Sequence, residues 1–518
     1  MNAFTLQQPL EIRVLMDNRW QKPPADVAID WQDNALYMTA QTSAVECLGI
    51  RWRTEFAPGA RFFGDAWERG YGDLGWSGMI YERVLPWYMA VREGETCSFI
   101  GAETGCGALI CFLADADGVT LLADTRAGNQ GVALGGRSLH ICTLHTAFNV
   151  PKPSYAFVCE NLKALCAHPL MPSAPVYGGN NWYYAYGRSS REQILADSAF
   201  IAEMADGLEN RPFMVVDDGW QLRADEQVTN GGPWIGNDRF GDMAEVARRM
   251  RETGVRPGIW YRPLLTTEEV KPSWIRREEK AGRTLDPSNE EVLEYVRDVT
   301  RALAQQGFEL LKHDFSTFDF MGDWGFVPHG DRLGNPSPIA DSSKTNAEHL
   351  LRLYAAIREG AGDAMVLGCN TIGHLTAGLF EIQRTGDDTS GLDWERTRRM
   401  GINTLAMRMP QHGAFYACDG DCVGSTQEVP WALNSQWLTL LAHSGTPLFV
   451  SADPQKQSDI QRAAIREAFA VASVPHAPAR PLDWEDTTCP SLWTFDDGER
   501  RFHWADWYAP NTRNIYWR

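Results

Sequence analysis

The sequence predicts an α/β protein with an eight-stranded β/α barrel between an N-terminal antiparallel β-sandwich and a small C-terminal β domain. Three observations support this fold class. Residues 1–170 consist of short apolar runs separated by turn residues, residues 171–455 repeat a strand, a loop and a helix, and residues 456–518 return to short strands. A chain of 518 residues is also too long for one hydrophobic core, so two or three domains are expected.

The N-terminal domain is predicted from apolar runs that Gly, Asp and Asn interrupt about every ten residues, a spacing typical of an antiparallel sandwich. The clearest runs are ALYMTAQTS (35–43), CSFIGAE (97–103), GALICFLAD (107–115) and GVTLLAD (118–124). The GCGALI segment within this region lacks the third glycine and the following helix of a dinucleotide fingerprint, so we do not interpret it as one. A proline-rich stretch, HPLMPSAPVYGG (168–179), places the domain boundary near residue 171.

The barrel is predicted from eight apolar strand candidates with helical patterns between many of them. The candidates are 175–182, 212–220, 256–263, 308–315, 364–370, 379–388, 413–421 and 446–453. Helices are expected within 190–208, 289–307, 346–362 and 394–409. An open doubly wound sheet is the alternative, but eight nearly regular units favour a closed barrel. The segment SLWTFDDGERRFHWADWYA (491–509) indicates short strands in the C-terminal domain.

The composition narrows the possible partners. Hydrophobic residues make up 44% and charged residues 22%, as is usual for a soluble globular protein. The formal net charge of -19 repels phosphate backbones and anionic lipids, so we expect neither nucleic acid nor a membrane as a partner. The 20 Trp residues fit large hydrophobic cores or a small-molecule sugar substrate, which packs its C–H face on aromatic rings. The composition leaves open whether the protein is a monomer or a homo-oligomer.

The N-terminal segment and the cysteines predict a cytoplasmic protein. The start of the chain has no basic region followed by an apolar run, so no secretory signal is expected, and no apolar stretch is long enough to span a membrane. The 11 Cys are odd in number and scattered, which indicates reduced thiols. Cys418 and Cys422 lie close together, but no second Cys or His pair is nearby, so we expect no structural metal and no cofactor.

Polar side chains follow the predicted strands at their carboxyl ends, where barrel enzymes carry their catalytic groups. These residues are Asp217, Asp218 and Trp220 after the second strand, Trp260, Tyr261 and Arg262 at the third, Lys312, His313 and Asp314 at the fourth, Cys369 and Asn370 at the fifth, and Arg384, Asp387 and Asp388 at the sixth. A single acidic strand end could be a helix cap or a buried ion pair. Several of them on one face of one barrel predict a functional site.

The residue types at these strand ends suit glycoside hydrolysis. The chain has no His-x-His or His-Glu-x-x-His pattern and no Gly-x-Ser-x-Gly elbow, so the usual metal or serine hydrolases are not indicated. Two carboxylates across a cleft can divide the reaction: one attacks the anomeric carbon, and the other donates a proton and then acts as a base. Lys312 lies two residues before Asp314 on the same face of a strand, where its charge would favour an ionised nucleophile.

Six motifs at these positions resemble those of the α-galactosidases of glycoside hydrolase family 36 and, more distantly, family 27. They are WYYAYG (182–187), DDGW (217–220), GIWYRP (258–263), LKHDF (311–315), LGCN (367–370) and RTGDDT (384–389). The resemblance covers the whole chain in domain order and is strongest to the compact bacterial branch. It implies a retaining enzyme that hydrolyses terminal α-linked galactose from oligosaccharides of the melibiose and raffinose type.

The resemblance also implies the catalytic pair. The nucleophile of the family is the aspartate of a Lys-x-Asp motif, which here is Asp314. The acid/base is the aspartate of Arg-x-x-x-Asp, and counting from Arg384 gives Asp388. Asp387 is the competitor, because some branches read Ser-Asp-x-Thr here, but RTGDDT aligns without a gap to the compact branch.

Further roles follow from the same resemblance. Asp217 and Asp218 would bind the 4- and 6-hydroxyls of galactose, Lys312 the 3- and 4-hydroxyls, and Arg384 and Cys369 the 2-hydroxyl. Other expected contacts with the sugar are Trp182, Tyr184, Trp220, Trp260 and Asp387. One N-terminal tryptophan should reach the site, and Trp52, Trp67 and Trp76 are the candidates. Asn181 replaces a serine of many relatives, and residues 370–380 differ from the Gly-rich version, so the exact substrate is open.

Three other functions remain as alternatives. A galactosyltransferase like the raffinose and stachyose synthases shares the barrel and its two aspartates, but its longer inserts are absent. A related α-glycosidase, such as an α-N-acetylgalactosaminidase, would act on another sugar. A non-catalytic carbohydrate-binding protein would keep the aromatic residues but lose the carboxylates, and both carboxylates are present.

Overall fold

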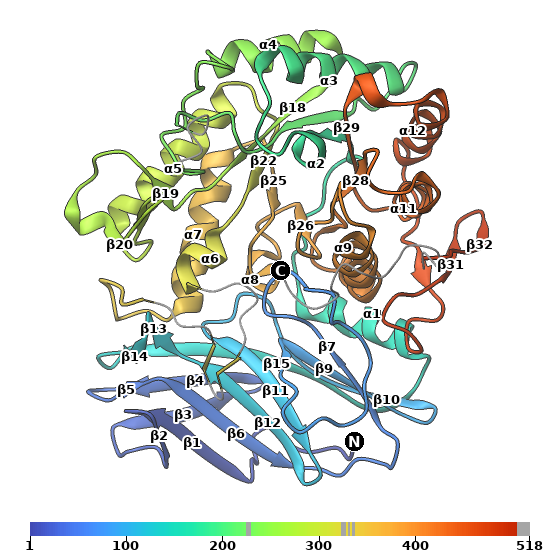
Figure 1. Ribbon diagram of the computed structural model, residues 1–518. Helices are drawn as coiled ribbons and strands as arrows, with labels where there is room; N and C mark the ends of the chain where they lie inside the picture. The colour runs from blue at the N-terminus through green and yellow to red at the C-terminus, as the bar shows by residue number, and fades with distance from the viewer. Residues whose placement is uncertain (224–228, 323–327, 330–331, 334–336, 505–518) are drawn as a thin grey trace.

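The computed structural model describes residues 1–518 except 224–228, 323–327, 330–331, 334–336 and 505–518, and Figure 1 draws it as two stacked parts. The lower part, coloured blue to cyan, contains the N-terminal antiparallel sheets, and the upper part contains a parallel sheet surrounded by helices. The segment 505–509 of the predicted C-terminal strands lies outside the described residues.

The N-terminal part contains two six-stranded antiparallel sheets and one small sheet. The first has the order β2 (Arg19–Gln21), β1 (Glu11–Met16), β6 (Cys47–Arg53), β12 (Gly118–Asp124), β11 (Leu109–Asp115), β8 (Leu85–Pro86). The second has the order β3 (Val27–Gln32), β4 (Ala35–Ala40), β15 (Ser138–Pro151), β10 (Thr96–Ala102), β9 (Tyr88–Glu93), β7 (Arg61–Gly64). The small sheet consists of β13 (Arg126–Ala127), β14 (Gln130–Ala133) and β5 (Ala44–Val45).

The alternation seen in the sequence directs one face of these strands inward. Leu36 and Met38 on β4 and Leu48 and Ile50 on β6 are fully buried in one hydrophobic core, although the two strands belong to different sheets. Successive side chains of a strand point to opposite faces, so alternate apolar residues can form this core while the others face outward. The predicted antiparallel character of the N-terminal region is confirmed.

The parallel sheet follows the predicted strand segments. Its order is β27 (Ala417–Asp419), β26 (Ile382–Arg384), β25 (Met365–Gly368), β22 (Leu310–His313), β18 (Arg256–Tyr261), β17 (Phe213–Val216), β16 (Tyr177–Asn180), β29 (Leu448–Ala452), β28 (Cys422–Ser425). Each of the predicted segments contains one of these strands, and β28 is an addition. Only Gly420 and Asp421 separate β27 from β28, so the two ends of the strand order adjoin along the chain and the sheet is barrel-like.

The parallel strands are buried on both sides. Phe213 and Val215 of β17 belong to a cluster inside the sheet, together with Leu310, Leu367 and Phe449 from other strands. Met214 and Val216 of the same strand belong instead to the large hydrophobic core, which also includes buried side chains of the surrounding helices. Burial on both faces explains why these segments read as continuous apolar runs rather than as alternating ones.

Helices surround the parallel sheet, and many of them connect its strands (Figure 1). They are α2 (Trp182–Ala185), α3 (Arg191–Met204), α4 (Met243–Thr253), α5 (Glu290–Gln305), α6 (Ser316–Met321), α7 (Asn346–Ala361), α8 (Gly373–Thr376), α9 (Trp394–Thr397), α10 (Thr404–Arg408), α11 (Trp431–His443) and α12 (Asp459–Ala472), which follows the last parallel strand. A further helix, α1 (Ser154–Leu165), packs against β10 and β15 of the N-terminal part. The predicted helix at 394–409 consists of α9, a π-helical turn at Arg398–Asn403, and α10.

The short elements complete the description. A small antiparallel sheet has the order β19 (Leu265–Thr266), β21 (Gly282–Leu285), β20 (Ile275–Glu279). In addition, β23 (Pro328–His329) pairs with β24 (Arg332–Leu333) in an antiparallel arrangement. The range expected to form the C-terminal β domain begins with α12, which packs against α11 and α3 of the helical layer. Its antiparallel sheet contains β30 (Arg480–Pro481), β31 (Leu492–Phe495) and β32 (Gly498–Arg501). In the described parts of the chain, no helix has the length and apolar character that a membrane crossing needs.

Candidate active site

The carboxyl end of β17 carries a buried ion pair. The Lys312 Nζ atom at β22 donates to Asp217 Oδ2 at 2.6 Å, and the two side chains are 8% and 4% exposed. Asn180 Nδ2 donates to the same oxygen at 2.6 Å, and Asn181 Oδ1 accepts from the Asp217 backbone N–H at 2.8 Å. Two donors on one carboxylate compensate for its removal from water and hold its position.

The neighbouring Asp218 is half-buried and has a different electrostatic environment. Gln221 Nε2 donates to Asp218 Oδ1 at 2.7 Å. Burial raises the pKa of Asp218 to about 7; the hydrogen bond from Gln221 opposes this shift, and the negative charge of Asp217 adds to it. The two adjacent carboxyl groups therefore differ in how readily they ionise.

Asp314 follows β22 directly, is 8% exposed, and is held on both carboxylate oxygens. The Phe315 N–H donates to Oδ1 at 2.8 Å, and Trp260 Nε1 approaches Oδ2 at 3.3 Å. We expected Lys312 to act as the cationic neighbour of Asp314, but the ion pair that the structure gives Lys312 is with Asp217. The carboxylate of Asp314 is oriented by an amide and an indole donor instead.

The end of β26 forms a second group of charges. The fully buried Arg384 contacts Asp421 Oδ2 at 2.9 Å and Asp388 Oδ1 at 3.3 Å through Nη2, and Cys369 Sγ at 3.4 Å through Nη1. The side chain of Asp388 is 36% exposed. Burial raises the pKa of Asp388, but the charges of Arg384, Arg69 and Lys312 outweigh this effect, so its pKa lies below its usual value.

Asp387 lies in a tighter environment than Asp388. Its Oδ1 pairs with Arg69 Nη2 at 2.8 Å, its Oδ2 pairs with Arg396 Nη2 at 2.6 Å, and its side chain is 15% exposed. Both oxygens of Asp387 are thus engaged by guanidinium groups. Asp388 is the more exposed of the two competing carboxylates.

The aromatic residues divide between the site and the core. Trp182 is half-buried and packs on the cluster inside the parallel sheet. Trp220 is fully buried and donates to the Trp260 carbonyl at 2.8 Å, so it supports Trp260 from behind. The Tyr184 hydroxyl donates to Asp197 of α3, which directs it toward the helical layer.

The three candidate tryptophans of the N-terminal region are all core residues. Trp52 is 1% exposed and donates to the Leu6 carbonyl at 3.0 Å. Trp67 packs edge-on against Trp87 and Trp76 stacks on Phe63, with ring centroids 5.4 Å and 5.2 Å apart.

The N-terminal side chain that contacts the strand-end carboxylates is Arg69. Sequence reasoning missed it, because the segment WERGYG carries no periodic signal. It also missed Asp421, which the strand-end rule could have found in the predicted segment 413–421.

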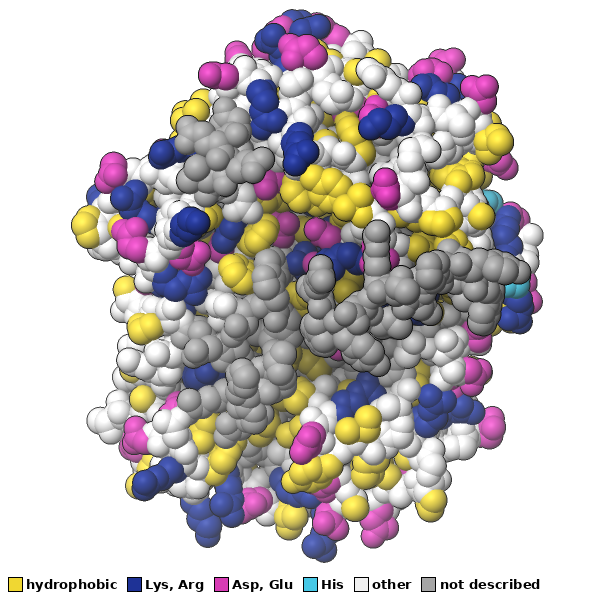
Figure 2. All heavy atoms as spheres, viewed as in Figure 1, with side chains coloured by type: hydrophobic (Ala, Val, Ile, Leu, Met, Phe, Trp, Pro, Cys, Tyr) yellow, Lys and Arg dark blue, Asp and Glu magenta, His cyan; other side chains and the backbone are white. Residues whose placement is uncertain are grey.

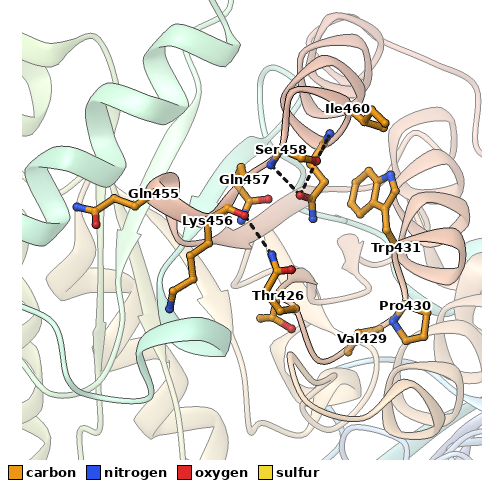
Figure 3. A pocket seen from close by; sticks show the side chains of 11 residues that line it. Thr426, Val429, Pro430, Trp431, Gln455, Lys456, Gln457, Ser458 and Ile460 are labelled. Carbon is orange, nitrogen blue, oxygen red and sulfur yellow. Dashed lines mark hydrogen bonds between the residues drawn. The ribbon is translucent and has the colours of Figure 1, made fainter.

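Figure 2 shows acidic and basic side chains close together near the centre of the face that it draws. A separate cavity of about 480 Å³ lies at the carboxyl ends of β28 and β29 (Figure 3). Its lining includes Trp431, Gln455, Gln457 and Gln461 but no carboxylate, so it does not contain the chemistry of the strand ends. Among the described residues no group of His, Cys, Asp and Glu could hold a metal ion, and Cys418 and Cys422 are free thiols.

A barrel-like parallel sheet with carboxylates at the carboxyl ends of its strands is an arrangement that suits glycoside hydrolysis. No family model matches the chain. It is 26% identical over 196 residues to the α-galactosidase AgaA of Geobacillus stearothermophilus, covering 35% of this chain and 25% of that protein. It is 28% identical over 142 residues to the bifunctional α-galactosidase/sucrose kinase AgaSK of Mediterraneibacter gnavus, covering 25% and 15%. The matched segments thus span a quarter or less of these relatives.

The solved structures extend the likeness to nearly the whole chain. The α-galactosidase TtGalA of Thermus thermophilus, solved with p-nitrophenyl α-D-galactopyranoside, superposes with a TM-score of 0.62 at 19% identity over 94% of this chain and 98% of that one. The family 36 α-galactosidase AgaA gives 0.61 at 14% identity over 90% and 70%. The resemblance to family 36 α-galactosidases that the motifs predicted is confirmed.

Proposed function

We propose that this protein is a retaining α-galactosidase that hydrolyses terminal α-linked galactose from oligosaccharides of the melibiose and raffinose type by double displacement. One observation carries the proposal: Asp314 and Asp388 follow parallel strands β22 and β26 at the same end of the sheet, and Asp388 contacts the buried Arg384 there. Structures similar to this chain include AgaA variants in complex with raffinose and with stachyose.

In the proposed mechanism, Asp314 attacks the anomeric carbon and Asp388 protonates the departing oxygen. The donors from Phe315 and Trp260 hold the Asp314 carboxylate in one orientation, which favours a nucleophile that need not reorganise. In the second step, Asp388 removes a proton from the attacking water. Its lowered pKa favours the ionised form that this step requires.

The remaining residues are proposed to bind the sugar or to support the residues that do. Asp217, Asp218 and Lys312 would bind the 3-, 4- and 6-hydroxyls, Arg384 and Cys369 the 2-hydroxyl, and Trp182 and Trp260 one face of the ring. We propose supporting roles for Trp220, which donates to Trp260, for Tyr184, which donates to Asp197, and for Asp387, which two arginines engage.

We also propose a three-part organisation. An N-terminal β-sandwich ends near residue 170, and the parallel sheet is a closed eight-stranded barrel in which β27 and β28 are two halves of the seventh strand. The barrel then includes α12, which packs on α11 and α3, so the C-terminal β part begins after this helix. The eleven cysteines are all free thiols, which favours a reducing compartment such as the cytoplasm.

The test is a panel of nitrophenyl α- and β-glycosides, with the product anomer followed by NMR. We expect hydrolysis of the α-galactoside and initial release of α-galactose. Initial release of β-galactose would contradict retention. Transfer of galactose to an added sugar in preference to water would indicate a transferase, faster cleavage of the 2-acetamido substrate would indicate an α-N-acetylgalactosaminidase, and inactivity on every α-glycoside would reject the proposal.

A further inference from the structure

We propose that Arg69, which comes from the N-terminal part of the chain, is a positioning residue for Asp388: it pairs with the adjacent Asp387 and adds a positive charge beside Asp388. This inference rests on the proposed role of Asp388 as acid/base. It goes beyond that role because it assigns the N-terminal part of the chain an influence on the ionisation of Asp388.

The segment that carries Arg69 is anchored to the parallel sheet by its own backbone. It lies between β7 and β8, and Gly70 forms a parallel bridge with Gly386 in the loop after β26. The Gly70 N–H donates to the Thr385 carbonyl at 2.8 Å, and the Asp387 N–H donates to the Gly70 carbonyl at 2.9 Å. The residue after Arg69 is therefore bonded directly to the residue before Asp388.

Two acidic side chains that precede Arg69 strengthen this connection. Asp65 Oδ1 accepts from Arg408 Nε at 2.7 Å in a pair that is almost fully buried, and Asn370 Nδ2 donates to Glu68. A Cβ atom at Gly70 would lie 2.8 Å from Thr404 Cγ2, so a larger residue would push the segment away from α10. The position of Arg69 is thus set by contacts that do not involve its own charge.

The two terminal nitrogens of the Arg69 guanidinium contact different groups. Nη2 pairs with Asp387 Oδ1 at 2.8 Å, whereas Nη1 lies 3.9 Å from Asp388 Oδ1 and 3.8 Å from Cys369 Sγ. The side chain is 5% exposed. Little water screens these interactions, so the charge of Arg69 acts on both carboxylates.

The charged groups that face Asp388 come from several elements. Arg384 on β26, Lys312 on β22 and Arg396 on α9 are cationic, Asp387 and Asp421 are anionic, and Tyr183 of α2 and Tyr186 after it also lie near. Removing Arg69 deletes one cation near Asp388. It also leaves Arg396 as the remaining described ion-pair partner of the negatively charged Asp387. Both changes make ionisation of Asp388 less favourable.

The experiment compares Arg69→Gln with Arg69→Lys and with the control Arg399→Gln. Arg399 Nη2 donates to the Tyr71 carbonyl at 3.3 Å and so anchors the same segment, but among the described residues it forms no ion pair with Asp387 or Asp388. The measurement is the pH dependence of kcat/KM on melibiose, whose poor leaving group requires a protonated acid. We expect the fall of kcat/KM on the alkaline side of the pH profile to shift to higher pH by roughly one unit in Arg69→Gln. It should stay in place in Arg69→Lys and in Arg399→Gln.

Other results would overturn the inference. An alkaline limb that does not move in Arg69→Gln, or that moves as far in Arg399→Gln, would make Arg69 merely a structural contact. If Arg69→Gln does not fold, the double variant Arg69→Gln/Asp387→Asn removes both members of the pair. The alkaline side of the double variant's pH profile should lie near that of the wild type. A shift of a full unit to higher pH would count against the inference.

A second readout does not require catalysis. Titration of the Asp388 carboxyl carbon by NMR, assigned with Asp388→Asn, should show a higher pKa in Arg69→Gln than in the wild type. If the wild type cleaves no α-galactoside, the proposed function fails while this titration still tests the influence of Arg69. An unchanged pKa in an active enzyme would reject the inference alone.

Discussion

The two halves of the carboxylate site are built in different ways. At the ends of β17 and β22, Asp217 and Asp314 are buried and are held by donors from the parallel strands and the residues directly after them, at 2.6–3.3 Å. After β26, Asp388 is 36% exposed, its nearest cations lie at 3.3 and 3.9 Å, and one of these cations comes from the N-terminal part of the chain.

This difference matches the two tasks that the proposed mechanism assigns. A nucleophile benefits from a fixed orientation and from little reorganisation, which burial and several donors provide. An acid/base must exchange a proton with the leaving group and then with water, so a partly exposed carboxyl whose ionisation is set by nearby charges suits this role. The comparison yields four predictions.

The largest effect is expected at the buried half. Asp314→Ala should reduce kcat by at least about 10³-fold, because it removes the proposed nucleophile and with it the covalent intermediate. Added azide should restore turnover and yield β-galactosyl azide, detected by NMR. Activity near that of the wild type would remove Asp314 from the mechanism.

The next prediction separates the two carboxylates of the exposed half. Asp388→Ala should slow melibiose hydrolysis by on the order of 10²- to 10⁴-fold but should spare the first step on an aryl galactoside with an acidic phenol, because a good leaving group departs without a proton. Azide should then give α-galactosyl azide. Asp387→Ala should slow both substrates to a similar degree without rescue. Exchanged patterns would move the acid to Asp387.

A smaller effect is expected when the buried ion pair is broken. Lys312→Met leaves the 4%-exposed Asp217 without its cation. This should cost about 3–5 kcal/mol in the free energy of unfolding, measured by urea denaturation. The double variant Lys312→Met/Asp217→Asn removes the orphaned charge and should recover part of the loss. Equal losses in the single and double variants would show that the pair contributes through packing rather than charge.

The smallest effect concerns the pH dependence of stability. The pKa of Asp218 in the folded protein is about 7, above its unfolded value, so the folded state binds more protons between these two values. Ionisation of Asp218 should therefore make the wild type less stable as the pH rises from about 4 toward 7. Asp218→Asn should remove this component, which thermal unfolding across that range would reveal. An identical pH dependence in both proteins would place the pKa of Asp218 near its unfolded value.

Much of the site could be predicted because it follows strand ends. A buried parallel strand reads as an apolar run, and the polar residues at its carboxyl end mark one edge of the sheet. The sequence therefore predicts Asp217, Asp314 and Arg384 at that edge without tertiary information. The same rule applied to 413–421 would have added Asp421. The helices at 190–208, 289–307 and 346–362 could be predicted from their periodicity. In the structure, the side chains of Ser190, Asn289 and Thr345 cap their N-termini.

Contacts between segments that lie far apart in the sequence could not be predicted from local sequence patterns. Nothing local shows that Trp52 is buried in the N-terminal core rather than placed over a sugar, or that α12 packs on α11 and α3. Sequence spacing put Lys312 beside Asp314, yet the side chain reaches across to Asp217 on another strand.

Local patterns thus specified the strands, their order along the chain and the carboxylates at their ends, because backbone geometry repeats at a fixed period. The partners of each charge were specified by packing. A buried ion must find its counterion wherever the folded chain brings one, and for Asp387 and Asp388 the fold brought Arg69 from more than three hundred residues away.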